Sequence, residues 1–169
     1  QHLQVTHDLA TALSGADLII SVVPSAAFRQ MLEDIKQLGC RTPLVWASKG
    51  LELATAKLPY EVAQETLGHQ QHWGVLSGPS FAVELAQGLP TAVTVAATDE
   101  DFTAEAGALL HGGNLRVYTS TDVIGVSVGG AVKNVMAIAA GISDGMKFGS
   151  NARAALITRG LAEMTRFGM

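Results

Sequence analysis

Cysteine is almost absent from this chain, since Cys40 is the only one in 169 residues. A single thiol excludes an internal disulfide and a zinc site built on cysteines, and it fits a protein of the reducing cytosol. Histidines do not replace the missing ligands, because His69 and His72 stand in a polar stretch with no acidic third ligand nearby. The sequence therefore predicts no metal centre.

Charge is also scarce: charged residues make up 15% of the chain, and the net charge is -4. No block of lysine and arginine occurs, which argues against a nucleic-acid partner. So few charges predict that much of the surface is covered, either by further parts of the protein or by a partner. Composition leaves the oligomeric state open, and a homodimer is one alternative.

Several familiar motifs are missing. The chain contains no Gly-x-Gly-x-x-Gly dinucleotide fingerprint, no Walker phosphate loop and no Gly-x-Ser-x-Gly nucleophile elbow. It also begins without a methionine and without a signal or transit segment. From these absences we expect the chain to be a fragment of a longer protein.

One long apolar run is present, from Val123 to Ser143, and its length alone would suit a membrane span. Four glycines, two serines and a central Lys133 interrupt it. A lysine at the centre of a helix opposes insertion by roughly 2.5–3.5 kcal/mol. We therefore expect a buried helix of a soluble protein and no membrane span.

Up to about residue 120, β-branched runs alternate with segments of helical spacing. The predicted strands are 18–23, 44–47, 75–76, 91–97 and 115–118, the fourth near an edge or end of the sheet. The predicted helices between them are 8–14, 25–38, 58–67, 81–87 and 99–111, with Ser25 and either Thr98 or Asp99 as caps. Only helices follow, over 122–145 and 151–167. This order predicts a doubly wound, parallel-sheet α/β domain over 1–120 and an α-helical domain from 121 to 169.

Three of the predicted strand ends carry residues suited to binding. They are Pro24-Ser25 with Phe28 in the next helix, Ser48-Lys49-Gly50, and Ser77-Gly78-Pro79-Ser80. Ligands of open α/β sheets bind outside the carboxyl ends of the strands. Lys49 suits a phosphate or carboxylate, and the Gly78–Ser80 segment opens a helix whose N–H groups suit an anion. Each feature alone is also typical of an ordinary turn or core residue, but together they predict one crevice.

Lys133 is the strongest pointer to chemistry, because it is the only charged residue between Asp122 and Asp144. An unpaired buried ammonium is costly, so such a lysine normally has a partner or a task. Small residues at i−4, i−3 and i+4 leave room beside it for a ligand or another backbone. Burial of an amine favours proton exchange near neutral pH, and Asn134 adds an amide next to it. A structural lysine that extends to solvent is the alternative.

Five blocks in series resemble the bacterial-type NAD(P)-dependent sn-glycerol-3-phosphate dehydrogenases. They are Val22–Ser25, Ser48–Glu52, Ser77–Glu84, Gly129–Asn134 and Asn151–Gly160. The match runs in order along essentially the whole chain. It implies the second half of a Rossmann-like domain, followed by the first helices of an all-α substrate domain.

The resemblance implies an oxidoreductase that interconverts dihydroxyacetone phosphate and sn-glycerol 3-phosphate with NAD or NADP. It also implies that the product supplies phospholipid synthesis and that the protein is cytoplasmic. By the same resemblance Lys133 is the general acid/base and contacts substrate, and Lys49 contacts both substrate and cofactor. The remaining implied residues are Gly78, Ser80 and Asn134 for substrate, and Phe28 and Ala82 for cofactor.

In this family the glycine fingerprint would precede Gln1, and Gly-Asp-Leu and Ser-Arg-Asn blocks would follow Met169. We therefore expect the chain alone to be inactive, and the sequence does not choose between NAD and NADP. Two alternatives stay open. One is another Rossmann dehydrogenase with a helical domain, of the 6-phosphogluconate or hydroxyacid type. The other is a non-catalytic module in which 123–169 drives oligomerisation.

Overall fold

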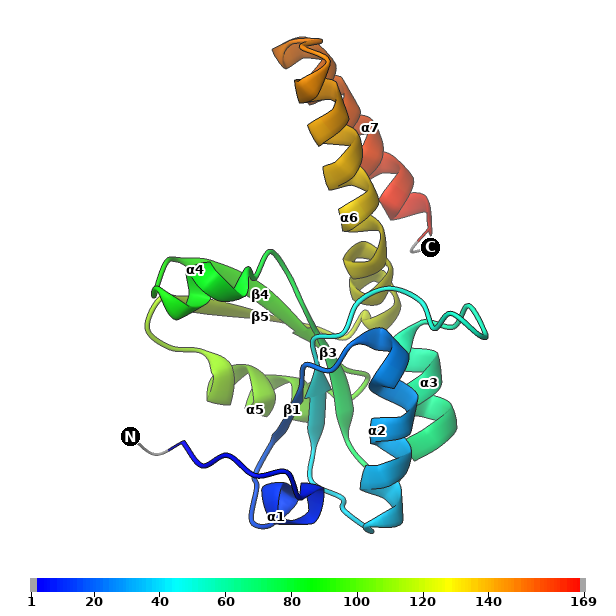
Figure 1. Cartoon of the computed structure of the whole chain (residues 1–169), viewed down its shortest axis with the longest axis vertical. Helices are drawn as coiled ribbons and strands as arrows, with labels where there is room; N and C mark the ends of the chain where they lie inside the picture. The colour runs from blue at the N-terminus through cyan, green and yellow to red at the C-terminus, as the bar shows by residue number, and fades with distance from the viewer. Residues whose placement is uncertain (1–2, 168–169) are drawn as a thin grey trace.

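The structure, a computed structural model, describes residues 3–167 and centres on a five-stranded sheet. The strands are β1 (Ile19–Ser21), β2 (Leu44–Trp46), β3 (Trp73–Ser77), β4 (Thr91–Ala96) and β5 (Leu115–Ser120), and they lie side by side in that order (Figure 1). All five predicted strands are confirmed. The pairs β1–β2, β2–β3 and β4–β5 are parallel, whereas β3–β4 is antiparallel.

The prediction of a wholly parallel sheet is therefore wrong at β4, which lies next to the edge strand β5. Parallel neighbours need a crossover, usually a helix that packs on a face of the sheet. The link between β3 and β4 contains only α4 (Ala82–Ala86), and residues 81–90 are all exposed. Because this short segment covers neither face, the chain re-enters the sheet at the end it left, and Ser77 pairs with Thr94.

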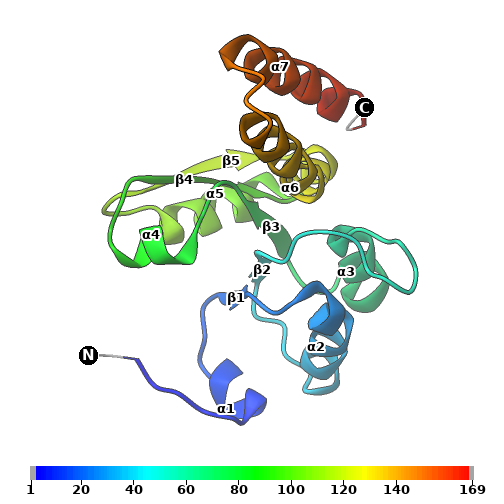
Figure 2. The same ribbon diagram turned by 45° about the horizontal axis from the view of Figure 1, so that its top comes forward.

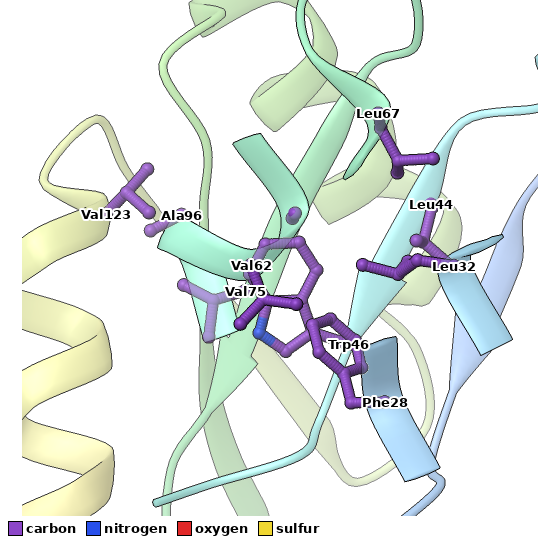
Figure 3. Packing of buried hydrophobic residues seen from close by; sticks show 10 residues of the cluster. Phe28, Leu32, Leu44, Trp46, Val62, Leu67, Val75, Ala96 and Val123 are labelled. Atoms are coloured by element: carbon purple, nitrogen blue, oxygen red, sulfur yellow. The ribbon is translucent and has the colours of Figure 1, made fainter. Parts of the chain in front are cut away.

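Helices α2 (Ser25–Gln37) and α3 (Pro59–Leu67) cover one face of the sheet. The cluster between them holds Phe28, Leu32, Leu44, Trp46, Val62, Ala63, Leu67, Val75, Ala96 and Val123 (Figure 3). Trp46 is fully buried, and its ring centroid lies 5.3 Å from that of Phe28. The predicted cap is wrong in detail, because Pro24 takes the N-cap position of α2 and Ser25 is the first helical residue.

Helix α5 (Glu100–Leu110) lies on the other face, where it packs on Val45 and Val95 through Phe102 and Ala106. The predicted cap is confirmed, since the Asp99 side chain accepts a hydrogen bond from the backbone N–H of Phe102 at 3.0 Å. Strand β2 serves both faces, because side chains alternate along a strand: Leu44 and Trp46 point to one side and Val45 to the other. Helix α1 (Leu9–Leu13) precedes the sheet.

Helices α6 (Val123–Gly145) and α7 (Ser150–Phe167) form an antiparallel hairpin that stands out from the sheet (Figures 1 and 2). The base of α6 packs on β3, β4 and α3, and α7 packs on α6. The expectation that this apolar helix is buried is wrong beyond its base. In α6 only Val123, Ser127, Gly130 and Ser143 are buried.

By length and composition α6 is the one helix within residues 3–167 that could cross a membrane, and only 17% of its most apolar stretch is buried. A single such helix is weak evidence for a membrane span. Lys133 near its middle opposes one, so the absence of a span stays a prediction.

Candidate functional site

A small hollow lies where β2, β3 and α6 meet. Lys49 and Ser48 follow β2, Ser77 ends β3, and Ser127 and Gly130 come from α6; all five line this hollow. A Cβ atom on Gly130 would lie 2.7 Å from Ser77 Oγ and 3.8 Å from Lys49 Cγ. Helix α6 can approach the ends of the strands this closely because residue 130 has no side chain. We call these five residues the junction.

Lys49 is half-buried, and its Nζ donates a hydrogen bond to the carbonyl oxygen of Ala47 at 3.1 Å. Burial, and then the positive charge of Lys133, lower the pKa of Lys49. Lys133, also half-buried, is therefore near enough to act on Lys49 electrostatically. Neither lysine forms an ion pair with a carboxylate among residues 3–167. Two neighbouring cations without a carboxylate partner favour the binding of an anion.

The chain that follows Lys49 is anchored by ion pairs. Gly50 has a φ of +96°, a backbone conformation that favours glycine. Two residues later, the carboxylate of Glu52 accepts hydrogen bonds from Nε and Nη2 of Arg29, each at 2.8 Å. Arg29 also reaches Glu65 at 3.1 Å. Glu52 also accepts a hydrogen bond from the hydroxyl of Thr55. The hydrogen bonds from Arg29, and then the one from Thr55, lower the pKa of Glu52 to about 2. The pair fixes the turn after Lys49 to α2.

Gly78 lies directly after β3, against the backbone of β4. A Cβ there would fall 2.7 Å from the oxygen of Ala92 and 2.9 Å from Cα of Val93, at a φ of +154°. Packing alone thus requires glycine at this position, and its role toward substrate stays a prediction. Ser80 is half-buried and Ala82 is exposed as the first residue of α4. Because α4 has only five residues, the argument from an N-terminal helix dipole is weak here.

Two other predicted residues lie apart from the junction. Phe28 is 2% exposed and packs against Trp46 in the core, so its position matches the alternative of an ordinary core residue. Asn134 is exposed on α6. The structure thus brings Lys49 and Lys133 together, whereas the roles assigned to Phe28, Ala82, Ser80 and Asn134 remain predictions.

Sequence reasoning missed three contributors to this region. Ser127 and Trp46 line the hollow beside the predicted Ser77, and Arg29 anchors the turn after Lys49. A signal existed for Ser127, because it stands three residues before Gly130 and therefore on the same face of α6. No local pattern pointed to Arg29, whose partner lies 23 residues away.

The region formed by the junction and the neighbouring Lys133 can bind and polarise a small anion, because it presents two ammonium groups beside hydroxyl groups. It contains no group able to transfer electrons, so redox chemistry there needs a cofactor. Strands β1, β2 and β3 run parallel and end on this side of the sheet. The crevice outside the carboxyl ends of such strands is where dinucleotides bind in doubly wound sheets, so these residues fit a nicotinamide cofactor.

Comparison with known proteins identifies the family. The model for the N-terminus of NAD-dependent glycerol-3-phosphate dehydrogenase matches residues 1–103, and the model for its C-terminus matches 122–169. Glycerol-3-phosphate dehydrogenase [NAD(P)+] of Methylobacillus flagellatus is 74% identical over 167 residues, which cover 99% of this chain and 51% of that protein. The chain thus spans about half the length of the curated relatives it matches.

Solved structures agree. The glycerol-3-phosphate dehydrogenase of Coxiella burnetii superposes with a TM-score of 0.82 at 48% identity, covering 94% of this chain and 49% of that one. The enzyme of Saccharomyces cerevisiae superposes with a TM-score of 0.81 at 31% identity, covering 95% and 48%. These matches confirm the Rossmann-like domain with helices after it, and they disfavour the 6-phosphogluconate and hydroxyacid alternatives. The chain belongs to the NAD-dependent glycerol-3-phosphate dehydrogenase family.

Proposed function

We propose that the protein carrying this chain interconverts dihydroxyacetone phosphate and sn-glycerol 3-phosphate with NAD or NADP. The observation that carries the proposal is that α6, which bears Lys133, packs beside Lys49 at the carboxyl ends of parallel strands, and that neither lysine has a carboxylate partner among residues 3–167. A small phosphorylated ketone matches it, because one end is a dianion and the other is a carbonyl that needs a proton. The relatives named for this activity support it.

Lys133 is the proposed general acid/base. When bound, the reduced cofactor supplies a hydride to the carbonyl carbon, and the carbonyl oxygen then needs a proton. The Nζ of Lys133 donates that proton, and the resulting neutral amine regains one from solvent. Lys49 holds the anionic end of the substrate.

The remaining roles are proposals of binding. Gly78, Ser80 and Asn134 contact substrate, and Lys49, Phe28 and Ala82 contact the cofactor. Ala82 is exposed and Lys49 half-exposed, so both are accessible, whereas Phe28 in the first turn of α2 is buried and offers at most an edge. Phe28 is thus the weakest of these assignments.

We also propose that residues 1–120 form the second part of the nucleotide-binding domain and that 121–169 begin a helical substrate domain. Strand β1 is an edge of this sheet, yet Ile20 and Val22 expose apolar surface there, as expected where further strands and layers continue. On this reading the 169-residue chain alone does not turn over substrate. The whole protein acts in the cytoplasm, supplies phospholipid synthesis, and is a candidate homodimer.

The test is oxidation of NADH and NADPH by the protein that carries this chain, assayed with dihydroxyacetone phosphate, unphosphorylated dihydroxyacetone and a panel of hydroxyacids and sugar phosphates. We expect turnover with dihydroxyacetone phosphate, and a loss of kcat/KM of at least 100-fold without the phosphate. Turnover of a hydroxyacid in preference to the phosphorylated ketone would contradict the proposal. The separate 169-residue chain should give a folded circular dichroism spectrum and no turnover.

A further inference from the structure

We propose that one buried water molecule occupies the hollow at the junction and bridges the sheet to α6. Trp46, at the end of β2, and Ser127, on the base of α6, are the two side chains that would hold it. The water would accept a hydrogen bond from Trp46 Nε1 and exchange one with Ser127 Oγ.

Both groups are buried and lack a protein partner. Trp46 is 0% exposed and Ser127 is 7% exposed, and neither Trp46 Nε1 nor Ser127 Oγ forms a hydrogen bond to any residue in 3–167. Buried polar groups without partners are rare, because each loses its bonds to water on folding. An indole N–H can only donate, so its partner must be an acceptor.

The two orphaned groups line the same hollow, which points to a shared partner. Figure 3 shows the indole nitrogen on the side of the Trp46 ring that faces α6. The space is of the order of one water molecule, too small for a three-carbon phosphate. Ser77 also lines the hollow, and its Oγ lies close to Gly130, so it gives the water a third polar neighbour. A buried water with about three polar partners is an ordinary component of protein interiors.

The position of this water gives it a structural consequence. It would join the end of β2 to the first turns of α6, three residues before the close approach at Gly130 and six before Lys133. The distance between Lys49 and Lys133 then depends in part on the water. This last step rests on the proposed function, whereas the water site itself does not.

The chain offers an internal comparison for testing the site, because it has two tryptophans. The indole N–H of Trp73 donates to the carbonyl oxygen of Gly68 at 3.0 Å, whereas that of Trp46 has no protein acceptor. NMR of the ¹⁵N-tryptophan-labelled protein, with Trp73→Phe to assign the signals, would record cross-relaxation between each indole proton and water. We expect the Trp46 indole proton to show a cross-peak to a long-lived water, and Ser127→Ala to weaken or abolish it. A Trp46 indole proton with no water contact would overturn the site.

A matched pair of serines gives the second measurement. Ser21 on β1 is 5% exposed and its hydroxyl is also orphaned, but it does not line this hollow. We expect Ser127→Ala to lower Tm by a few degrees, because a bridged hydroxyl is removed, and Ser21→Ala to leave Tm unchanged or to raise it. Equal effects of the two changes would overturn the proposal.

A third readout separates the water from the reaction. In the active protein, Ser127→Ala should lower kcat several-fold with little change in KM, and Ser21→Ala should change neither. An unchanged kcat together with a lost water signal would overturn the positioning role. If the cross-peak is present but dihydroxyacetone phosphate is not reduced, the water site stands and the proposed function fails.

Discussion

The sheet with its covering helices and the α6–α7 hairpin differ in how they bury apolar residues. In the first region, clusters on both faces of the sheet place residues such as Leu32, Trp46 and Val95 at 0% exposure. In the hairpin, Val123 is the one large apolar side chain buried among the described residues, while Val135, Ile138 and Ile142 are 58–64% exposed. The first region carries its own core, and the hairpin does not.

This difference places the candidate site on a boundary. Lys49 stands on the region that has its own core, and Lys133 stands on the helix that leaves it. The distance between these two lysines therefore depends on the junction, where Gly130 lies against Ser77. Four predictions test how far the two regions differ, from the largest expected effect to the smallest.

Truncation of a buried leucine should separate the two regions most clearly. Leu32→Ala on α2 removes a side chain that is 0% exposed and should lower the free energy of unfolding by about 2–5 kcal/mol. Ile138→Ala on α6 removes one that is 64% exposed and should change it by less than about 0.5 kcal/mol. Urea unfolding followed by circular dichroism measures both. Similar losses would mean that the hairpin is as well packed as the sheet region.

Lys133→Ala should lower kcat for dihydroxyacetone phosphate reduction by about 100-fold or more, the usual scale of general acid–base catalysis. The circular dichroism spectrum should not change, because this side chain is not part of either core cluster. Lys147→Ala is the matched control, since Lys147 is an exposed lysine at the far end of the same hairpin. Near-normal turnover by Lys133→Ala would remove the assigned role.

Binding of inorganic phosphate or glycerol 3-phosphate should take up protons at alkaline pH below 10.5. Burial and then Lys133 lower the pKa of Lys49 from 10.5 in the free protein, and a bound dianion would raise it again. Affinity should therefore fall as the pH rises through the free pKa of Lys49. Calorimetry in two buffers of different ionisation enthalpy counts the protons.

The same titration of Lys133→Ala provides the control for Lys49. The positive charge of Lys133 is the second cause of the lowered pKa of Lys49, so its removal raises that pKa in the unliganded protein. Fewer protons should therefore be taken up on binding at a given pH. Proton release on binding, or an uptake unaffected by the substitution, would contradict a shared anion site.

Glu52 should make a smaller, acid-dependent contribution to the stability of the sheet region. Its pKa is lowered from 4.5 to about 2, chiefly by Arg29, so its contribution is complete above 4.5 and is lost as the pH falls toward 2. Glu52→Gln should flatten the dependence of Tm on pH in that window. Glu105→Gln, an exposed glutamate on α5, should leave the dependence intact. An equally steep dependence in Glu52→Gln would contradict the ion pair.

Local patterns predicted most of the elements but not how they meet. The β-branched runs near Ile19, Leu44 and Thr91 predicted strands, because burial on a pleated surface selects those side chains. The direction of β4 was not predictable in this way, since an extended run reads the same in either direction. It follows instead from the short, exposed α4, which cannot cross the sheet.

Contacts between distant residues set the other limit. Lys49 could be predicted to lie in a crevice because it follows a strand, whereas the family resemblance, not spacing, implied that Lys133 acts at the same site. The Arg29–Glu52 pair and the meeting of Trp46 with Ser127 depend on tertiary packing that no spacing encodes. The exposure of α6 was also missed, because helical periodicity shows that a face is apolar but not what lies against it.

The close approach at Gly130 has a mechanical consequence for the protein. Helix α6 rises about 1.5 Å per residue, so Lys133 stands about 4.5 Å beyond Gly130, while Gly145 stands about 22 Å beyond it. If the helix pivots at Gly130, a tilt that carries its far end through about 2 Å moves the backbone of Lys133 by only about 0.4 Å. Lys133, the proposed proton donor, therefore lies close to the pivot, and a displacement of the far end of α6 is reduced about five-fold at Lys133.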